Sequence, residues 1–169
     1  MRRRRPAPSF ETVVQDHGGM IARIAAAHEA DPSAREDLVQ DIHYALWRAL
    51  PGFRGESALK TFVARVAAYR SVTHVQRALK RPPQGELPPD LAAPEASPET
   101  EAIASDEAGR LIAAVRGLPL GLRETALLAL EGLTHPEIAA VLGVTTNAVA
   151  IRMSRARPRL RGLIEGEPP

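Results

Sequence analysis

The chain contains no cysteine, few aromatic residues and no long apolar run. The absence of cysteine excludes a disulfide scaffold, thiolate metal sites and cysteine nucleophiles. No segment reaches the roughly 18–20 uninterrupted apolar residues that a membrane-spanning helix needs. Arg2 to Arg5 resemble the start of a signal peptide, but no apolar segment follows them. We therefore expect no export signal and a cytoplasmic protein.

Proline gathers where bulky apolar residues are scarce. Residues 82–100 hold six prolines and cannot bury enough surface to offset their ordering entropy, so we predict a flexible acidic linker there. The linker separates a first module at residues 10–81 from a second module at residues 101–165. We expect residues 1–9, which precede the first module, to form a disordered basic tail. With 169 residues, 44% of them hydrophobic, two small helical modules fit better than one large core.

The net charge of +2 hides a strong segregation. Residues 11–47 carry seven acids against two bases, whereas residues 48–81 carry eight bases against one acid. Residues 82–107 carry seven acids and no base, and residues 108–169 carry eight arginines against five acids. Two basic segments on either side of an acidic one suggest two polyanion-binding modules joined by a spacer that avoids the polyanion. Ordinary solvated helix faces are the alternative interpretation.

Helical periodicity runs through both modules and no segment alternates like a strand, which predicts an all-α fold. In the first module the expected helices cover residues 11–28, 33–50 and 58–80. Ser33, with Glu36 three residues later, has the pattern of a capping box for the second helix, and Ser57 could cap the third. Asp37, Asp41, Tyr44 and Arg48 share the face of the second helix that lies opposite its apolar residues.

The second module has the pattern of a helix-turn-helix. Its expected helices begin near residues 101, 120, 135 and 146. Thr134 and Glu137 form a second capping-box pattern, Gly143 would end the helix that follows, and Thr145 would cap the last one. That last helix carries five arginines within ten residues, which suits phosphate contacts beside a major groove. Pro158 should kink or end it.

Short motifs in both modules resemble known proteins. Asp37-Leu-Val-Gln-Asp41, Leu46-Trp-Arg-Ala-Leu-Pro51 and Phe53-Arg-Gly-Glu-Ser57 resemble region 2 of bacterial sigma factors. Leu118-Pro119, Glu131-Gly-Leu-Thr-His-Pro-Glu-Ile-Ala139 and Arg152-Met-Ser-Arg-Ala-Arg157 resemble region 4. With only a linker between them, the order is similar to the extracytoplasmic-function (ECF) class.

The resemblance implies a promoter-specificity subunit with no cofactor, whose partners are core RNA polymerase, promoter DNA and an anti-sigma factor. Region 2 would bind the clamp coiled coil and region 4 the beta flap. The residues implied for the clamp are Asp37, Leu38, Gln40 and Asp41. Those implied for the minus-ten element are Phe53, Arg54, Gly55, Glu56, Ser57, Lys60, Arg65, Tyr69, Arg70, His74 and Arg77. Those implied for the minus-thirty-five element are Thr146, Asn147, Ala150, Ile151, Arg152, Ser154, Arg155 and Arg157.

Several positions depart from the family pattern. Ala68-Tyr69 stands where Arg-Asn is usual, and Thr73 replaces a usual Asp. Ala150 stands where a basic residue commonly reaches bases, and Ile151 replaces a small polar residue. Losing a bidentate arginine–guanine contact would remove roughly 1–3 kcal/mol of the binding free energy that discriminates guanine from the other bases. Promoter recognition could then depend on Thr146, Asn147 and Ser154.

Other functions remain open from the sequence alone. A sigma-like decoy that sequesters an anti-sigma factor would tolerate the alanines at positions 68 and 150, and a helix-turn-helix regulator could bind DNA without polymerase. Ser57 and Lys60 match the Ser-x-x-Lys pattern of a nucleophile, but no companion motif supports an enzyme. The five histidines show no metal-ligand spacing, and no phosphate-binding glycine loop is present.

Overall fold

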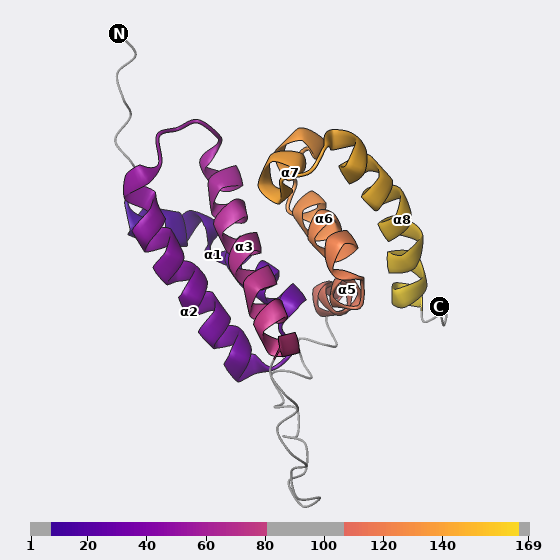
Figure 1. Ribbon diagram of the computed structural model, residues 1–169. Coiled ribbons are helices and arrows are strands. Elements are labelled where there is room, and N and C mark those ends of the chain that lie inside the picture. The colour runs from indigo at the N-terminus through magenta and orange to yellow at the C-terminus, as the bar shows by residue number, and fades with distance from the viewer. Residues whose placement is uncertain (1–7, 81–106, 166–169) are drawn as a thin grey trace, which may run out of the picture.

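The computed structural model describes residues 8–80 and 107–165, which form seven α-helices, one short 3₁₀-helix and no strand. The first module consists of α1 (Phe10–His28), α2 (Pro32–Ala49), η1 (Leu50–Gly52) and α3 (Leu59–Lys80). The second consists of α5 (Glu107–Arg116), α6 (Leu120–Leu130), α7 (His135–Leu142) and α8 (Thr146–Glu165). The expected all-α class with two small helical domains is confirmed (Figure 1). The expected linker at 82–100, residues 1–7 of the expected tail and residues 101–106 of the helix expected to begin near residue 101 lie outside the described residues.

The three long helices of the first module pack around a common aliphatic core. Ile21 and Ile24 of α1 meet Ile42 and Leu46 of α2 and Val63 of α3, and none of these five side chains is exposed to solvent. Small residues such as Ala64 and Ala67 let α3 approach its neighbours closely. Burial of this aliphatic surface provides the main stabilisation of the module, and it fixes which face of each helix is left for solvent.

The starts of α2 and α3 differ from the expected caps. The Asp31 carboxylate accepts a hydrogen bond from the Ala34 amide at 2.7 Å, and Pro32 occupies the first helical position. The cap at Ser33 is therefore wrong, because Pro32 and its preset φ favour a helix that begins two residues earlier. In α3 the Phe62 amide bonds to the Ala58 carbonyl, which places Ala58 rather than Ser57 at the capping position.

Replacing Asp31 by alanine is expected to lower the free energy of unfolding by about 1 kcal/mol, because the Ala34 amide loses its acceptor. Replacing Ser33 by alanine should change it by less than about 0.5 kcal/mol, as for an ordinary exposed position. Urea denaturation of both variants measures the difference. A larger loss for Ser33→Ala than for Asp31→Ala would contradict the observed cap.

The second module contains the expected helix-turn-helix. The Thr134 hydroxyl and the Glu137 carboxylate form the predicted capping box at the start of α7. Gly143 ends α7 with φ of +67°, a backbone conformation that favours glycine. Thr145 then caps α8 by accepting a hydrogen bond from the Ala148 amide at 3.1 Å. Helix α8 continues through Pro158 to Glu165, so the proline does not end it.

The two modules pack directly against each other, which the sequence did not predict. Helix α5 lies against α1, and α7 lies against α3, with α6 between them (Figure 1). One cluster of buried apolar residues runs through both modules, from α1 to α3 and on to the second module's α5, α6, α7 and α8. A smaller cluster, centred on Leu118 and Ala156, belongs to the second module alone. The described residues thus form one closed arrangement of two domains.

Candidate functional site

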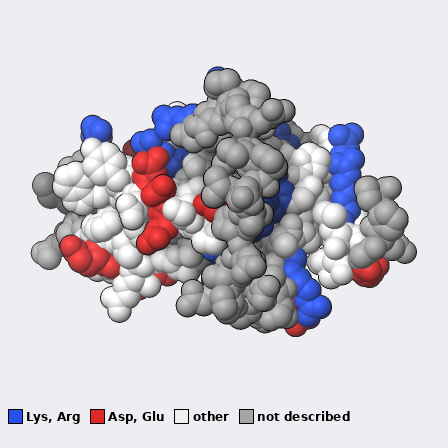
Figure 2. Space-filling model, turned by 90° about the horizontal axis from the view of Figure 1, so that it is seen from below, with Lys and Arg blue, Asp and Glu red and all other residues white. Residues whose placement is uncertain are grey.

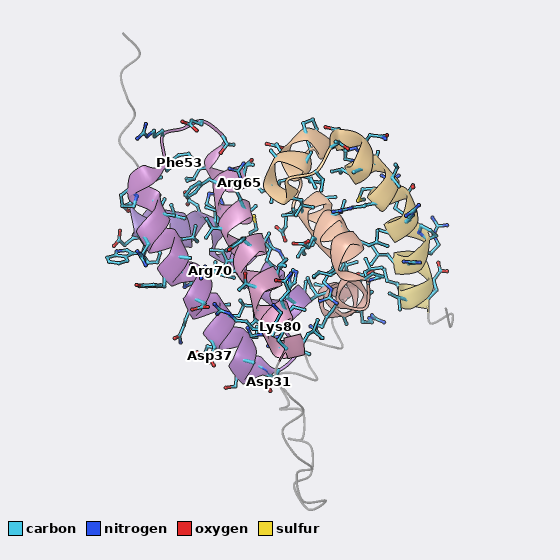
Figure 3. The ribbon with its side chains drawn as sticks, viewed as in Figure 1. Asp31, Asp37, Phe53, Arg65, Arg70 and Lys80 are labelled. Atoms are coloured by element: carbon cyan, nitrogen blue, oxygen red, sulfur yellow. The ribbon has the colours of Figure 1, made fainter. Side chains whose placement is uncertain are left out.

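The outward side of α2 carries the acidic residues that the motifs single out. Asp37, Gln40 and Asp41 are all exposed, and Figure 3 shows Asp37 near the end of α2 that lies far from Phe53. Leu38 differs, because its side chain is 1% exposed and belongs to the core. We therefore correct its predicted contact with polymerase: Leu38 anchors α2 from beneath the exposed face and does not line it.

Two aromatic side chains extend this acidic face along α2. Tyr44 and Trp47 are more than half exposed and stack with their ring centroids 6.2 Å apart. The Arg48 guanidinium lies 5.9 Å from the centroid of the Tyr44 ring. We call Asp37, Gln40, Asp41, Tyr44 and Trp47 the α2 face. Our sequence-based site omits both aromatics, although Tyr44 follows Asp37 and Trp47 follows Gln40 by seven residues, two helical turns.

The loop between η1 and α3 is anchored at one end and open at the other. The half-buried Phe53 ring packs on the Phe62 ring with centroids 4.9 Å apart, and Phe62 also packs against the core. Gly55 has φ of +75°, which lets the chain turn sharply. Arg54 and Glu56 are exposed, and Ser57 is half-buried at the entry to α3. The loop therefore holds polar groups at a fixed distance from the core.

Helix α3 presents most of its predicted DNA contacts to solvent. Arg65, Tyr69 and Arg77 are exposed, Arg70 is half-buried, and Figure 3 shows Arg65 and Arg70 following one another along the helix. His74 is engaged instead with Glu29, the residue that follows α1, with Nε2 2.8 Å from the carboxylate.

Two further positions on α3 differ from an open DNA surface. Ala68 is 5% exposed, so its departure from the family pattern concerns packing against neighbouring helices. Lys60 lies at the surface, but its ammonium group donates a hydrogen bond to the Glu131 carbonyl of the second module. Of the predicted minus-ten residues on α3, Lys60 and His74 are thus already bound within the protein.

Helix α8 has an inward and an outward stripe of side chains. Val149 and Ala156 are buried, with Met153 and Leu160 packed beside them. The outward stripe consists of Thr146, Asn147, Ala150, Ile151, Ser154, Arg155 and Arg157, all of which are exposed. The Ser154 hydroxyl donates to the Ile151 carbonyl of its own helix at 2.8 Å, which leaves it as an acceptor for an outside partner.

Arg152 lies apart from that stripe. It is half-buried, and its guanidinium lies beside Gly121 of α6, where an added Cβ would be 3.7 Å from Cζ. Glu124, also on α6, is half-buried, and this burial raises the pKa of its carboxyl to about 7 against the opposing charges of Arg152 and Arg123. Arg152 therefore faces α6 in this structure, and the exposed arginines on α8 are Arg155, Arg157, Arg159 and Arg161.

Charge is distributed unevenly between the two sides of the molecule. Figure 2 shows acidic side chains gathered on the side of α2 and a column of basic side chains on the side of α8. On this face of the molecule the acids on the α2 side are therefore separated from the basic column of α8. Such separation allows one surface to bind a basic partner while the other binds a polyanion.

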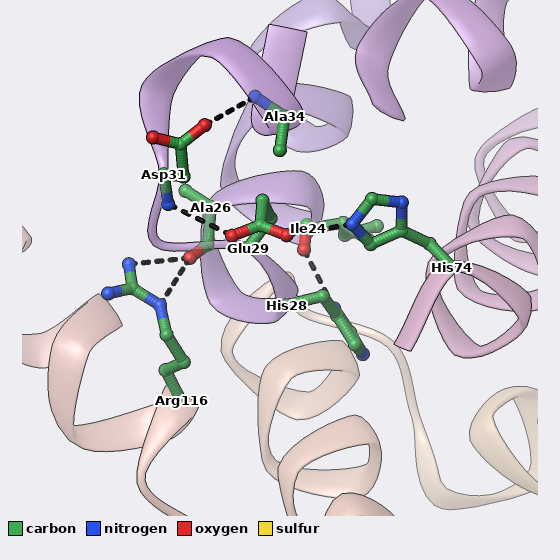
Figure 4. Close-up of polar contacts among 8 residues, drawn as sticks. All are labelled: Ile24, Ala26, His28, Glu29, Asp31, Ala34, His74 and Arg116. Carbon is green, nitrogen blue, oxygen red and sulfur yellow. Dashed lines mark hydrogen bonds and ion pairs between the residues drawn. The ribbon is translucent and has the colours of Figure 1, made fainter. Parts of the chain in front are cut away.

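The carboxyl end of α1 is a polar junction between the modules (Figure 4). Arg116 of α5 donates two hydrogen bonds to the Ala26 carbonyl, at 2.9 and 2.6 Å. His28 is 7% exposed, and its Nδ1 lies 2.8 Å from the Ile24 carbonyl. Burial lowers the pKa of His28 to about 4, which the hydrogen bond to Ile24 opposes and the charges of Arg123 and His74 reinforce. Neutral His28 therefore belongs to the closed structure.

The stability of the protein should fall in mild acid because of His28. An unfolded histidine titrates near pH 6.5, so below that pH the unfolded chain binds a proton that folded His28 rejects until about pH 4. Between pH 7.5 and pH 5 this difference removes about 2 kcal/mol from the free energy of unfolding. In His28→Asn, whose amide nitrogen can still donate to Ile24, that part of the loss should disappear. Equal pH slopes in urea denaturation of the two proteins would show that folded His28 takes up its proton normally.

The described residues contain neither a metal-binding cluster nor a membrane-spanning helix. Within 8–80 and 107–165, no three histidine or acidic side chains lie close enough together to hold a metal ion. None of the helices in these ranges combines the length and apolar character needed to cross a bilayer.

Comparison with known proteins decides the family. The Sigma-70 region 2 model matches residues 13–81, and the Sigma-70 region 4 model matches residues 108–160. The chain is 30% identical to RNA polymerase sigma factor NccH of Alcaligenes xylosoxydans xylosoxydans, over 93% of this chain and 87% of NccH. It is 33% identical to ECF RNA polymerase sigma factor ShbA of Streptomyces griseus, over 77% of this chain and 71% of ShbA. The chain belongs to the ECF sigma factors.

Solved structures agree with this family and fold. The sigma factor CnrH, solved in complex with the cytosolic domain of CnrY, has a TM-score of 0.67 and 26% identity to this sigma factor, over 94% of this chain and 89% of CnrH. The fold is also shared with RpoE from Bartonella quintana, solved in complex with the anti-sigma factor NepR. RpoE has a TM-score of 0.71 and 21% identity, over 92% of this chain and 96% of RpoE. The first module is therefore region 2 of this sigma factor, and the second is region 4.

Proposed function

We propose that this ECF sigma factor binds core RNA polymerase through the α2 face and directs transcription from promoters contacted by α3 and α8. The observation that carries the proposal is the exposed acidic and aromatic face on α2, which is distinct from the exposed basic residues on α3 and α8. Asp37 and Asp41 supply charge for a basic polymerase surface, while Tyr44 and Trp47 supply the rigid aromatic area that protein interfaces favour.

At the minus-ten element, region 2 would hold an unpaired strand. Unstacking a base costs a few kcal/mol, so the site must return contacts of that size. Arg65 and Arg77 suit phosphates, and the exposed ring of Tyr69 offers a surface on which a base could stack. The polar groups of the Phe53–Ser57 loop would meet the edge of a base.

At the minus-thirty-five element, α8 would lie in the major groove. Its exposed arginines suit phosphates, and Thr146, Asn147 and Ser154 offer polar groups to base edges. Ala150 contributes no hydrogen bond from its side chain, so affinity at this element should rest more on phosphates than on sequence. Tethering two modest contacts in one chain then raises the overall affinity by effective concentration.

The remaining features of the proposal concern partners and setting. The protein itself catalyses no reaction and acts in the cytoplasm, where polymerase and promoter DNA are found. An anti-sigma factor would mask the α2 face or the DNA surfaces, since two relatives of this fold were solved bound to CnrY and NepR. The beta flap is the expected polymerase contact of region 4.

Run-off transcription with purified core polymerase tests the proposal. Transcripts that depend on both this protein and a promoter sequence are expected. Binding to an anti-sigma factor without any transcript would point to a decoy, and a footprint on duplex DNA without polymerase would point to a conventional regulator. The decoy loses one of its two arguments, because Ala68 belongs to the core rather than to a damaged DNA surface.

A further inference from the structure

Regions 2 and 4 are joined by polar contacts that converge on one turn. Arg23 of α1 donates from Nε and Nη2 to the two carboxylate oxygens of Glu131, at 2.6 and 2.8 Å. Lys60 of α3 donates to the backbone carbonyl of the same residue. Thr61 donates to the Glu137 carboxylate at 3.3 Å, just beyond the turn. Glu131 thus binds two basic side chains of region 2 at once.

This packing is incompatible with binding both promoter elements together. The elements are centred about 25 base pairs apart, as their names state, which is about 85 Å along B-form DNA. In the structure α3 lies directly against α7, the first helix of the helix-turn-helix (Figure 1). The chain between Lys80 and Glu107 spans 27 residue steps, or at most about 90 Å when extended, so it is long enough for the modules to separate.

We propose that the closed packing of regions 2 and 4 is an autoinhibited resting state, in which Glu131 serves as the latch. The inference rests on the proposed function, because it concerns the surfaces assigned there to promoter DNA. Opening the latch must precede simultaneous contact with both elements. Since Lys60 is itself a predicted minus-ten contact, the Glu131 carbonyl and a DNA phosphate compete for the same ammonium group.

The latch has the physical character of a contact that can open. The Glu131 side chain is 8% exposed, but that of Arg23 is 53% exposed, so water reaches the pair from one side. The Glu131 carboxylate raises the pKa of Arg23, chiefly through its hydrogen bonds, so Arg23 keeps its charge throughout the physiological range. Gly132 follows with φ of +81°, which turns the chain so that the Glu131 carbonyl meets Lys60. Apolar residues shared between the modules keep the free protein closed.

Distance measurements on the full chain test the latch. The protein has no cysteine, so a thiol-reactive spin label attaches only to cysteines that are introduced. We choose Gln15→Cys on α1 and Arg161→Cys on α8, because both positions are exposed. Glu131→Gln should increase the ratio of open to closed molecules about five-fold and speed association with core polymerase by a similar factor. Hydrogen bonds between charged groups in proteins support an effect of this size.

Two controls make the result specific. Glu165→Gln removes an exposed acid at the end of α8 and should change neither the distances nor the association rate. Arg23→Glu combined with Glu131→Arg exchanges the partners and should restore much of the closed population. If the fraction of open molecules in Glu131→Gln equals that in the parent protein, or does not exceed that in Glu165→Gln, the proposal is overturned.

The outcome separates the latch from the proposed function. If the parent protein supports promoter-dependent transcription but its labels report an open molecule before polymerase is added, the latch is wrong and the function stands. If the labels report closure relieved by Glu131→Gln, while neither protein directs transcription, the function is wrong and the closed packing stands.

Discussion

Replacing Asp37 and Asp41 together by lysine is expected to weaken binding to core RNA polymerase by at least about 100-fold. Both side chains are exposed, so the fold loses no buried contact. The substitution turns two attractive charges into repulsive ones against a basic partner, and like charges facing each other at an interface cost several kcal/mol. Fluorescence anisotropy of labelled protein titrated with core enzyme measures the change.

A matched control keeps the net charge of that variant while leaving the α2 face intact. Asp16→Lys with Glu36→Lys also reverses two exposed acids, one on α1 and one in the N-terminal half of α2. Its affinity for polymerase should stay within about three-fold of the parent, the reduction expected from a change in long-range steering alone. If both double variants bound equally well, the assignment of the α2 face to polymerase would be wrong.

Replacing Leu38 by alanine is expected to lower the free energy of unfolding by about 2–5 kcal/mol, the second large effect. The side chain is 1% exposed and lies in the core cluster, so its removal leaves a cavity. A small helical domain has a total stability of only about 5–15 kcal/mol, so region 2 would be severely weakened. Thermal and urea denaturation followed by circular dichroism measure the loss.

An exposed residue near Leu38 on α2, Gln40, provides the control for Leu38→Ala. Gln40→Ala removes an exposed polar side chain and should change stability by less than about 0.5 kcal/mol while weakening polymerase binding. The two variants therefore separate a residue that supports the α2 face from one that belongs to it. If Leu38→Ala were as stable as the parent protein but bound polymerase more weakly, Leu38 would be a polymerase contact rather than a core residue.

Local chemistry made much of the second module predictable. The capping box of Thr134 and Glu137, the left-handed Gly143 and the Thr145 cap all depend on residues at most four positions apart. In the first module, apolar periodicity located the three helices to within about two residues. These features depend on the backbone and its nearest neighbours, which a single sequence displays directly.

Other features depend on competition or on distance along the chain. Asp31 and Ser33 both suit a helix start, and the intervening Pro32 decides between them. Leu38 lies inside a motif of polar residues, and the resemblance carried by that motif implied a polymerase contact for a side chain that is buried. Arg23 and Glu131 are 108 positions apart, and no local pattern announces their pairing. The contact between the modules follows from the complementary shape of two folded surfaces.

The exposed Trp47 gives the protein a built-in optical reporter. It is the single tryptophan of the chain, so intrinsic emission excited at the red edge arises from one position on the α2 face. Stacking on Tyr44 holds the indole in a defined orientation while leaving more than half of it in water. Any protein that covers α2 will exclude water from the indole ring and shift its emission to shorter wavelength. Tryptophan-free regulators and peptides could thus be screened for docking on α2 without attaching a dye.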